Sequence, residues 1–325
     1  MDRREYLATA ASAASAVAIA GCSGGSGSGD GTTTAETTTS ADAQQHLSAA
    51  GEALRKAGEE LSAQSDRLEE ADMTDGVDVR TESLDGYLDT AASELDAAEE
   101  SATDPQRERI AAARGYVSFA RKFGEFLDVF AEGYTRLGTG LTYFKSKRFE
   151  DAAGKLETAR KTISRAEDVL AVLRDRAEKL DTDTLSELER VDVESMQTGL
   201  ATLDELVPVL TAFADGLRDV SLGMVDFKAA NAKLGNDEFE TSERRFAAAK
   251  DHFASGYQTF KKQEESAPAS VESSVVQLTC YAKALRDASE HFAATAEALA
   301  NGNNERAKSE AEKGKQAANR CSFDV

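Results

Sequence analysis

Tryptophan is absent from this chain of 325 residues, and proline occurs only 3 times. Proline interrupts helices because it has no backbone N–H to donate and its ring clashes with the preceding turn. Alanine, the strongest helix former, dominates the apolar residues instead. The scarcity of proline and the abundance of alanine together predict an all-α protein built from long helices.

Histidine, the side chain used most often as a general base or metal ligand, is also scarce, with 3 copies. In a ferritin-like di-metal bundle a histidine follows a glutamate by three residues. Alanine stands three residues before each histidine here, at Ala43, Ala249 and Ala288. The sequence also has no nucleophile elbow, no glycine-rich phosphate loop and no cysteine pair with zinc spacing. We therefore expect no catalytic residues, no metal site and no cofactor, and we expect that the protein is not an enzyme.

Positively charged residues are outnumbered, because the chain has 38 lysines and arginines but 59 aspartates and glutamates. Its formal net charge is therefore -21. Such a charge repels polyanions, so nucleic acid is not an expected partner. The acid-rich composition, sparse in large aliphatic residues, resembles that of proteins from salt-loving archaea. In those proteins high salt screens the repulsion between like charges.

The N-terminus has the layout of a signal peptide. Two arginines, Arg3 and Arg4, precede an uncharged, alanine-rich run from residue 8 to residue 20. As a helix this run of 13 residues is about 20 Å long, whereas the hydrocarbon core of a bilayer is about 30 Å thick. The run is too short for a stable membrane span, so we expect it to be cleaved from the chain.

Two motifs in this segment resemble known export signals. Ile19-Ala20-Gly21-Cys22 resembles the lipobox of exported lipoproteins, and Arg3-Arg4-Glu5-Tyr6-Leu7 resembles the twin-arginine signal of haloarchaeal lipoproteins. The resemblance covers only the N-terminus, with Ile19 where leucine is usual and Tyr6 where phenylalanine is usual. It implies a signal peptide over residues 1–21, with Arg3 and Arg4 as export signal, and a lipid on Cys22. The mature protein would be anchored at the outer face of the cytoplasmic membrane and exposed to the exterior.

Residues 22–42 read as a flexible tether. Serine and glycine repeats give way to two runs of threonine, and large apolar residues are absent up to Ser40. Such a coil cannot form a core, and about 20 residues of it span roughly 25 Å on average. The third region, residues 43–325, is expected to be one helical domain.

Apolar residues in this domain recur with helical periodicity. The first segment has the Leu/Ala series Leu47, Ala50, Leu54, Ala57, Leu61, Leu68 and Ala71, and the second has Leu84, Leu88, Ala91, Leu95 and Ala98. The third segment has two aromatic-rich rows, which are Tyr116, Phe123, Phe130, Leu137 and Phe144, and beside them Phe119, Phe126, Gly133 and Gly140. These rows are expected to be core, and their glycines to mark close contacts with a neighbouring backbone.

We predict about eight helices in four antiparallel hairpins, forming an elongated helical repeat array or bundle. The expected ranges are 43–73 with 79–102, 105–146 with 148–178, 184–235 with 237–264, and 270–300 with 303–321. A capping box from Thr184 to Glu187 is expected to start the fifth helix. Pro208 is expected to kink or break that helix near Leu206.

Parts of the pattern recur within the chain. The stretch from Phe130 to Phe144 matches the stretch from Phe213 to Phe227 at an offset of 83 residues, which places Gly133 and Gly140 opposite Gly216 and Gly223. A second match follows the point where each stretch is expected to turn into the next helix. At an offset of 90, the series Phe149, Ala152, Leu156 and Ala159 corresponds to Phe239, Ser242, Phe246 and Ala249. A fainter version of this series has Asn304, Ala307, Ala311 and Gly314. This spacing resembles that of tetratricopeptide-type repeats, while the helix lengths fit spectrin-like repeats equally well.

A disulfide between Cys280 and Cys321 is predicted from the last hairpin. Residues that face each other in an antiparallel hairpin lie at equal distances from the turn, and the midpoint of this pair falls beside the turn signal Asn301-Gly302. Export would also place both thiols in an oxidising compartment.

Two classes of function remain open for the helical domain. The leading expectation is a non-catalytic scaffold or protein-interaction module for another envelope protein. The alternative is a ligand-binding or sensory lipoprotein that holds a small molecule between the aromatic long helices. A buried aromatic row favours the scaffold, whereas a ligand cavity between the third and fifth helices favours the alternative.

Overall fold

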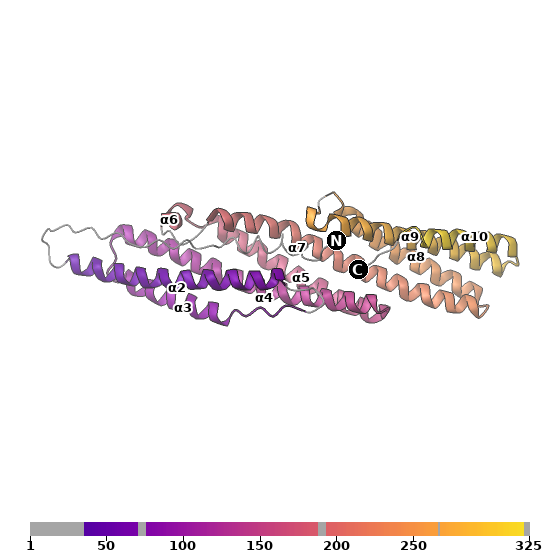
Figure 1. Cartoon of the computed structure of the whole chain (residues 1–325), viewed down its shortest axis with the longest axis horizontal. Coiled ribbons are helices and arrows are strands. Elements are labelled where there is room, and N and C mark those ends of the chain that lie inside the picture. The colour runs from indigo at the N-terminus through magenta and orange to yellow at the C-terminus, as the bar shows by residue number, and fades with distance from the viewer. Residues whose placement is uncertain (1–35, 71–75, 188–192, 266, 322–325) are drawn as a thin grey trace. The chain divides into compact units, whose positions relative to one another are not determined.

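The computed structural model describes residues 36–70, 76–187, 193–265 and 267–321, and within them it has nine helices and no strand (Figure 1). The signal peptide, the lipobox and most of the expected tether lie outside these residues. No helix in the described part of the chain is long and apolar enough to cross a membrane. The helices are α2 (Glu36–Glu70), α3 (Glu82–Glu99), α4 (Asp104–Lys145), α5 (Phe149–Glu178), α6 (Thr182–Glu187), α7 (Val193–Gly235), α8 (Phe239–Gln263), α9 (Ala269–Ala300) and α10 (Asn304–Ala318).

The prediction of an all-α fold is confirmed, and most helix ends lie close to their expected positions. The first helix departs most, because α2 begins at Glu36, so residues 36–42 of the expected tether are helical. Adding residues to an existing helix needs no new nucleus, which explains how it extends into a threonine-rich stretch of low helix propensity. The expected fifth helix is two helices, α6 and α7.

The capping box predicted to start at Thr184 was wrong, and of the two outcomes predicted for Pro208, a kink or a break, the break does not occur. Pro208 lies inside α7 without breaking it, although proline removes one backbone hydrogen bond. Its neighbours Val207 and Val209 are buried, so packing outweighs that loss. The cap before Thr184 is also different, because the Asp181 carboxylate accepts hydrogen bonds from the Thr184 backbone N–H at 3.1 Å and from its hydroxyl at 2.8 Å. Asp181 is thus the residue that accepts hydrogen bonds at this helix start, and Thr184, which was predicted to begin the capping box, donates to it.

The chain divides into two compact units. The first contains α2, α3, the part of α4 up to Ala131 and the chain from Arg165 to Asp204. In this unit α2 packs against α3 along the predicted Leu/Ala series. Most members of that series are buried, namely Ala50, Leu54, Ala57, Leu61, Leu68, Leu84, Leu88, Ala91, Leu95 and Ala98, while Leu47 is half-buried and Ala71 lies outside the described residues.

The second unit contains the rest of α4 and α5 and the chain from Glu205 onward. A cluster of four phenyl rings joins α7, α8 and α9 at its centre. Phe227 lies 5.2 Å from Phe246 and 5.6 Å from Phe292 between ring centroids, and Phe253 lies 6.5 Å from Phe227. This aromatic cluster is the apolar core against which the last two hairpins pack.

Three hairpin corners in the second unit have the same backbone geometry. Each has one residue of positive φ, which is Lys147 at 58°, Asp237 at 61° and Gly302 at 71°. The next backbone N–H closes each corner onto a carbonyl five residues back, with bonds from Arg148 to Tyr143, from Glu238 to Lys233 and from Asn303 to Ala298 of 2.9, 3.0 and 2.8 Å. This Schellman-type ending satisfies a carbonyl that the helix terminus leaves free, and it sets the register of each hairpin.

Candidate functional site

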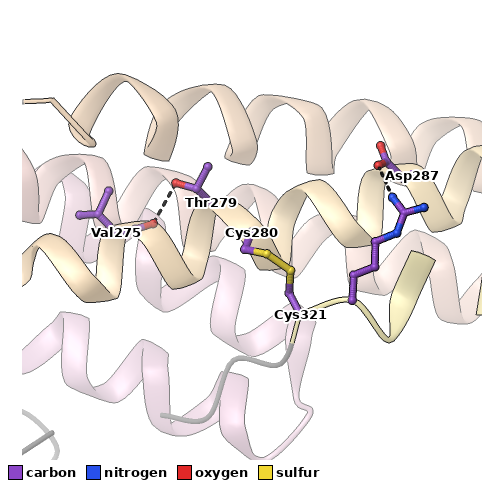
Figure 2. Close-up of a disulfide and its surroundings, with 6 residues drawn as sticks. Val275, Thr279, Cys280, Asp287 and Cys321 are labelled. Carbon is purple, nitrogen blue, oxygen red and sulfur yellow. Dashed lines mark hydrogen bonds and ion pairs between the residues drawn. A yellow bond between two sulfur atoms is a disulfide. The ribbon is translucent and has the colours of Figure 1, made fainter. Parts of the chain in front are cut away.

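Of the predicted site residues, only the two cysteines of the last hairpin fall within the described part of the chain. Arg3, Arg4 and Cys22 lie outside it. Cys280 on α9 forms a disulfide with Cys321, three residues beyond the end of α10, and their α-carbons are 5.9 Å apart (Figure 2). The prediction of this pair is confirmed. The chain turns at Asn301–Asn303, so the two cysteines lie at the same height along the hairpin.

Each of the three histidines lies beside a carboxylate of a neighbouring helix. His46 Nδ1 is 2.7 Å from Glu94 in the hairpin of α2 and α3, and His291 Nδ1 is 2.8 Å from Glu310 in the hairpin of α9 and α10. His252 Nε2 is 3.7 Å from Asp226 in the hairpin of α8 and α7. Within the described residues no group of three or more His, Cys, Asp or Glu side chains is arranged to hold a metal ion. The histidines thus link paired helices.

A group of charged side chains that sequence reasoning missed joins α5, α7 and α8. We name it the Arg218 cluster, and its members are Glu157, Arg160, Asp215, Arg218, Asp219 and Ser255. Arg218 binds the Glu157 carboxylate at 2.8 Å, Asp215 at 3.0 Å and Asp219 at 2.7 Å. The Ser255 hydroxyl donates to the other oxygen of Asp219 at 2.5 Å. One arginine therefore contacts three carboxylates from two helices.

The electrostatics of the Arg218 cluster favour a structural role. Asp219 is 6% exposed, so its charge needs the neighbouring arginine and hydroxyl. Hydrogen bonds from Arg160 and Arg218 lower the pKa of Glu157 to about 2. Glu157 is thereby held as a tightly paired carboxylate, whereas a general acid or base works best with a pKa near the operating pH. The cluster is suited to joining helices and not to proton transfer.

The aromatic row at the centre of the first unit is closed to solvent. Tyr116, Phe119, Phe123, Phe126 and Phe130 are each at most 4% exposed. Successive rings along this part of α4 stack at centroid distances of 5.4 to 6.2 Å. This packing is that of a core, as the sequence predicted.

The side chain of Tyr116 carries a buried polar atom without a partner. Among the described residues, the hydroxyl of Tyr116 is the buried side-chain oxygen or nitrogen without a hydrogen bond. Burial also raises the pKa of this hydroxyl well above its usual range, because the charged form is disfavoured in an apolar environment. An unpaired buried hydroxyl costs about 1–3 kcal/mol.

We expect Tyr116→Phe to leave the protein as stable as before or to stabilise it by about 1 kcal/mol, because it removes an unsatisfied group and keeps the ring. Tyr134→Phe provides the comparison, since Tyr134 is buried on the same helix and its hydroxyl, unlike that of Tyr116, is not a buried atom without a hydrogen bond. Denaturant unfolding of the two variants checks the prediction. A clear loss of stability in Tyr116→Phe would mean that its hydroxyl is satisfied in solution.

Comparisons with known proteins provide no relative from which to infer a function, because no family model, curated protein or solved structure matches the chain.

Proposed function

We propose that this chain is an exported lipoprotein whose helical domain, held at the outer face of the membrane by a lipid on Cys22, serves as a non-catalytic scaffold for another envelope protein. The observation that carries the anchoring is the order of the N-terminal features. Paired arginines, a short apolar run, Gly21-Cys22 and a serine and glycine tract follow one another within about 30 residues. This order is typical of a lipoprotein precursor.

The closed interior supports the scaffold over the ligand-binding alternative. The aromatic row of α4 is buried against protein side chains. In the aromatic cluster of the second unit, Phe246 and Phe253 are buried and Phe227 and Phe292 are half-buried. Exposed large hydrophobic side chains in the described residues are Val172 and Val276. A partner would therefore be recognised mainly through polar and charged side chains, as in many non-obligate interfaces.

The anchoring is tested with Cys22→Ser. We expect this variant to be exported but to be recovered in the soluble fraction, because it lacks the residue that carries the lipid. Cell fractionation followed by immunodetection measures the change. The matched variant, Arg3→Lys with Arg4→Lys, should keep the protein inside the cell, since it alters the export signal alone. Cys22→Ser protein that stays tightly in the membrane would contradict the proposal.

The scaffold role is tested by crosslinking in intact cells and identification of the captured proteins by mass spectrometry. We expect one envelope protein to be captured in near-stoichiometric amounts by the wild-type chain and much less by Cys22→Ser, because the tether holds the domain next to its partner. Equal capture of many unrelated proteins by both forms would argue against a specific scaffold. Recovery of a small molecule with the purified domain would favour the ligand-binding alternative.

A further inference from the structure

We propose that the Cys280–Cys321 disulfide is a latch that holds α10 on α9, and that reduction by an external dithiol releases α10 while the rest of the domain stays folded. The bond lies where a thiol reaches it, because Cys280 is exposed and Cys321 is half-buried at the end of α10 (Figure 2). Access of the attacking thiolate to a sulfur is a main determinant of the rate of thiol–disulfide exchange.

The apolar face of α10 is too small to hold this helix firmly by itself. Its buried residues are Ala307, Gly314 and Ala317. The preceding hairpin differs, because α8 buries three phenyl rings, those of Phe246, Phe253 and Phe260. A helix of 15 residues is marginal in isolation. Without the disulfide, α10 depends on small side chains and on polar contacts.

Those polar contacts lie near the surface and add little. Arg306 pairs with Glu297 at 2.6 Å between side chains that are 47% and 43% exposed. Arg320 lies 3.5 Å from Asp287, and its side chain is 62% exposed. Exposed ion pairs of this kind contribute about 0–1 kcal/mol each. The contact of His291 with Glu310 is the best shielded of the set, with exposed fractions of 31% and 17%.

The helix beneath is anchored independently of α10. α9 buries Val271, Val275, Leu278 and Leu285, and its Phe292 contacts Phe227 and Phe246 of the aromatic cluster. Gly314 of α10 lies so close to Phe292 that a Cβ there would be 3.1 Å from the ring. Release of α10 would therefore uncover one edge of Phe292 and leave α9 in place. The reduced form would present an apolar surface that the oxidised form covers.

The chemistry balances as two exchanges. A thiolate of the dithiol attacks one sulfur of the pair, forming a mixed disulfide and expelling the other cysteine as a thiolate, which takes up a proton. The second thiol of the reductant loses its proton and attacks the mixed disulfide, so the reductant is oxidised to a disulfide and the remaining cysteine leaves as a thiolate that is then protonated. Two electrons pass from the dithiol to the protein.

Amide hydrogen exchange of the whole chain, with and without dithiothreitol in the same high-salt buffer, tests the latch. We expect residues 304–318 to exchange roughly 100- to 1,000-fold faster after reduction. This factor corresponds to the stabilisation expected from a disulfide that closes a loop of about 40 residues. Residues 239–263 should be unchanged. Thiol titration confirms that reduction is complete.

Two variants sharpen the experiment. Cys280→Ser with Cys321→Ser should exchange like the reduced protein whether or not dithiothreitol is present. Ala311→Leu, at the place that Leu156 and Phe246 occupy after the other two corners, should slow exchange in the reduced protein by enlarging the apolar face of α10. Unchanged exchange of α10 after complete reduction would overturn the latch, and so would loss of protection throughout α8 and α9.

Discussion

Gly223→Leu is expected to lower the free energy of unfolding by about 1–3 kcal/mol, because it overpacks a close contact between α7 and α8. A Cβ at this position would lie 2.6 Å from the ring of Phe253, which is itself fully buried. The ring belongs to the aromatic cluster and has little room to move. Thermal and denaturant unfolding measure the loss, which should appear as a lower midpoint with an unchanged denaturant slope.

Gly154→Leu is the matched control for this substitution. Gly154 is also inside a long helix, but a Cβ there would meet nothing within 4 Å. Removing a glycine from an open helical position raises helix propensity, so this variant should gain about 0.5–1 kcal/mol. A neutral result at both positions would mean that the contact of Gly223 with Phe253 is looser than the structure has it.

Arg218→Met should destabilise the second unit by about 3 kcal/mol, because it leaves the buried carboxylate of Asp219 with only the Ser255 hydroxyl. It also removes the contact with Glu157. The double variant Arg218→Met with Asp219→Leu should regain most of that loss, since apolar residues that replace a buried ion pair are often tolerated. Equilibrium unfolding of the single and double variants gives the coupling free energy.

An exposed pair serves as the reference. Arg148 lies 2.8 Å from Asp151 at the start of α5, with side chains 56% and 53% exposed. We expect Arg148→Met to change stability by under about 1 kcal/mol, as is usual for surface ion pairs. Equal effects of the two arginine substitutions would argue against a special role for the Arg218 cluster.

The glycines show how far sequence reasoning goes. Their close packing was predicted correctly, and for Gly133 and Gly140 the close neighbour was expected to be backbone. A Cβ added at Gly133 would indeed lie 3.2 Å from the backbone nitrogen of Ile163, whereas at Gly216 and Gly223 the neighbours are the rings of Phe260 and Phe253. The offset of 83 also aligned Gly140 with Gly223. Counted from the corners at Lys147 and Asp237, however, Gly133 and Gly223 are equivalent, each 14 residues before its corner.

The sequence by itself determined the all-α fold, most helix ends, the buried aromatic rows and the pairing of Cys280 with Cys321. These features follow from short-range rules, because helical periodicity is read within a few turns and a hairpin with one clear turn has only one register. The tertiary structure alone decided the Arg218 cluster, the carboxylate partner of each histidine and the continuity of α7 through Pro208. Each of these depends on how the helices rotate about their axes and pack against one another, which many weak packing contacts set together.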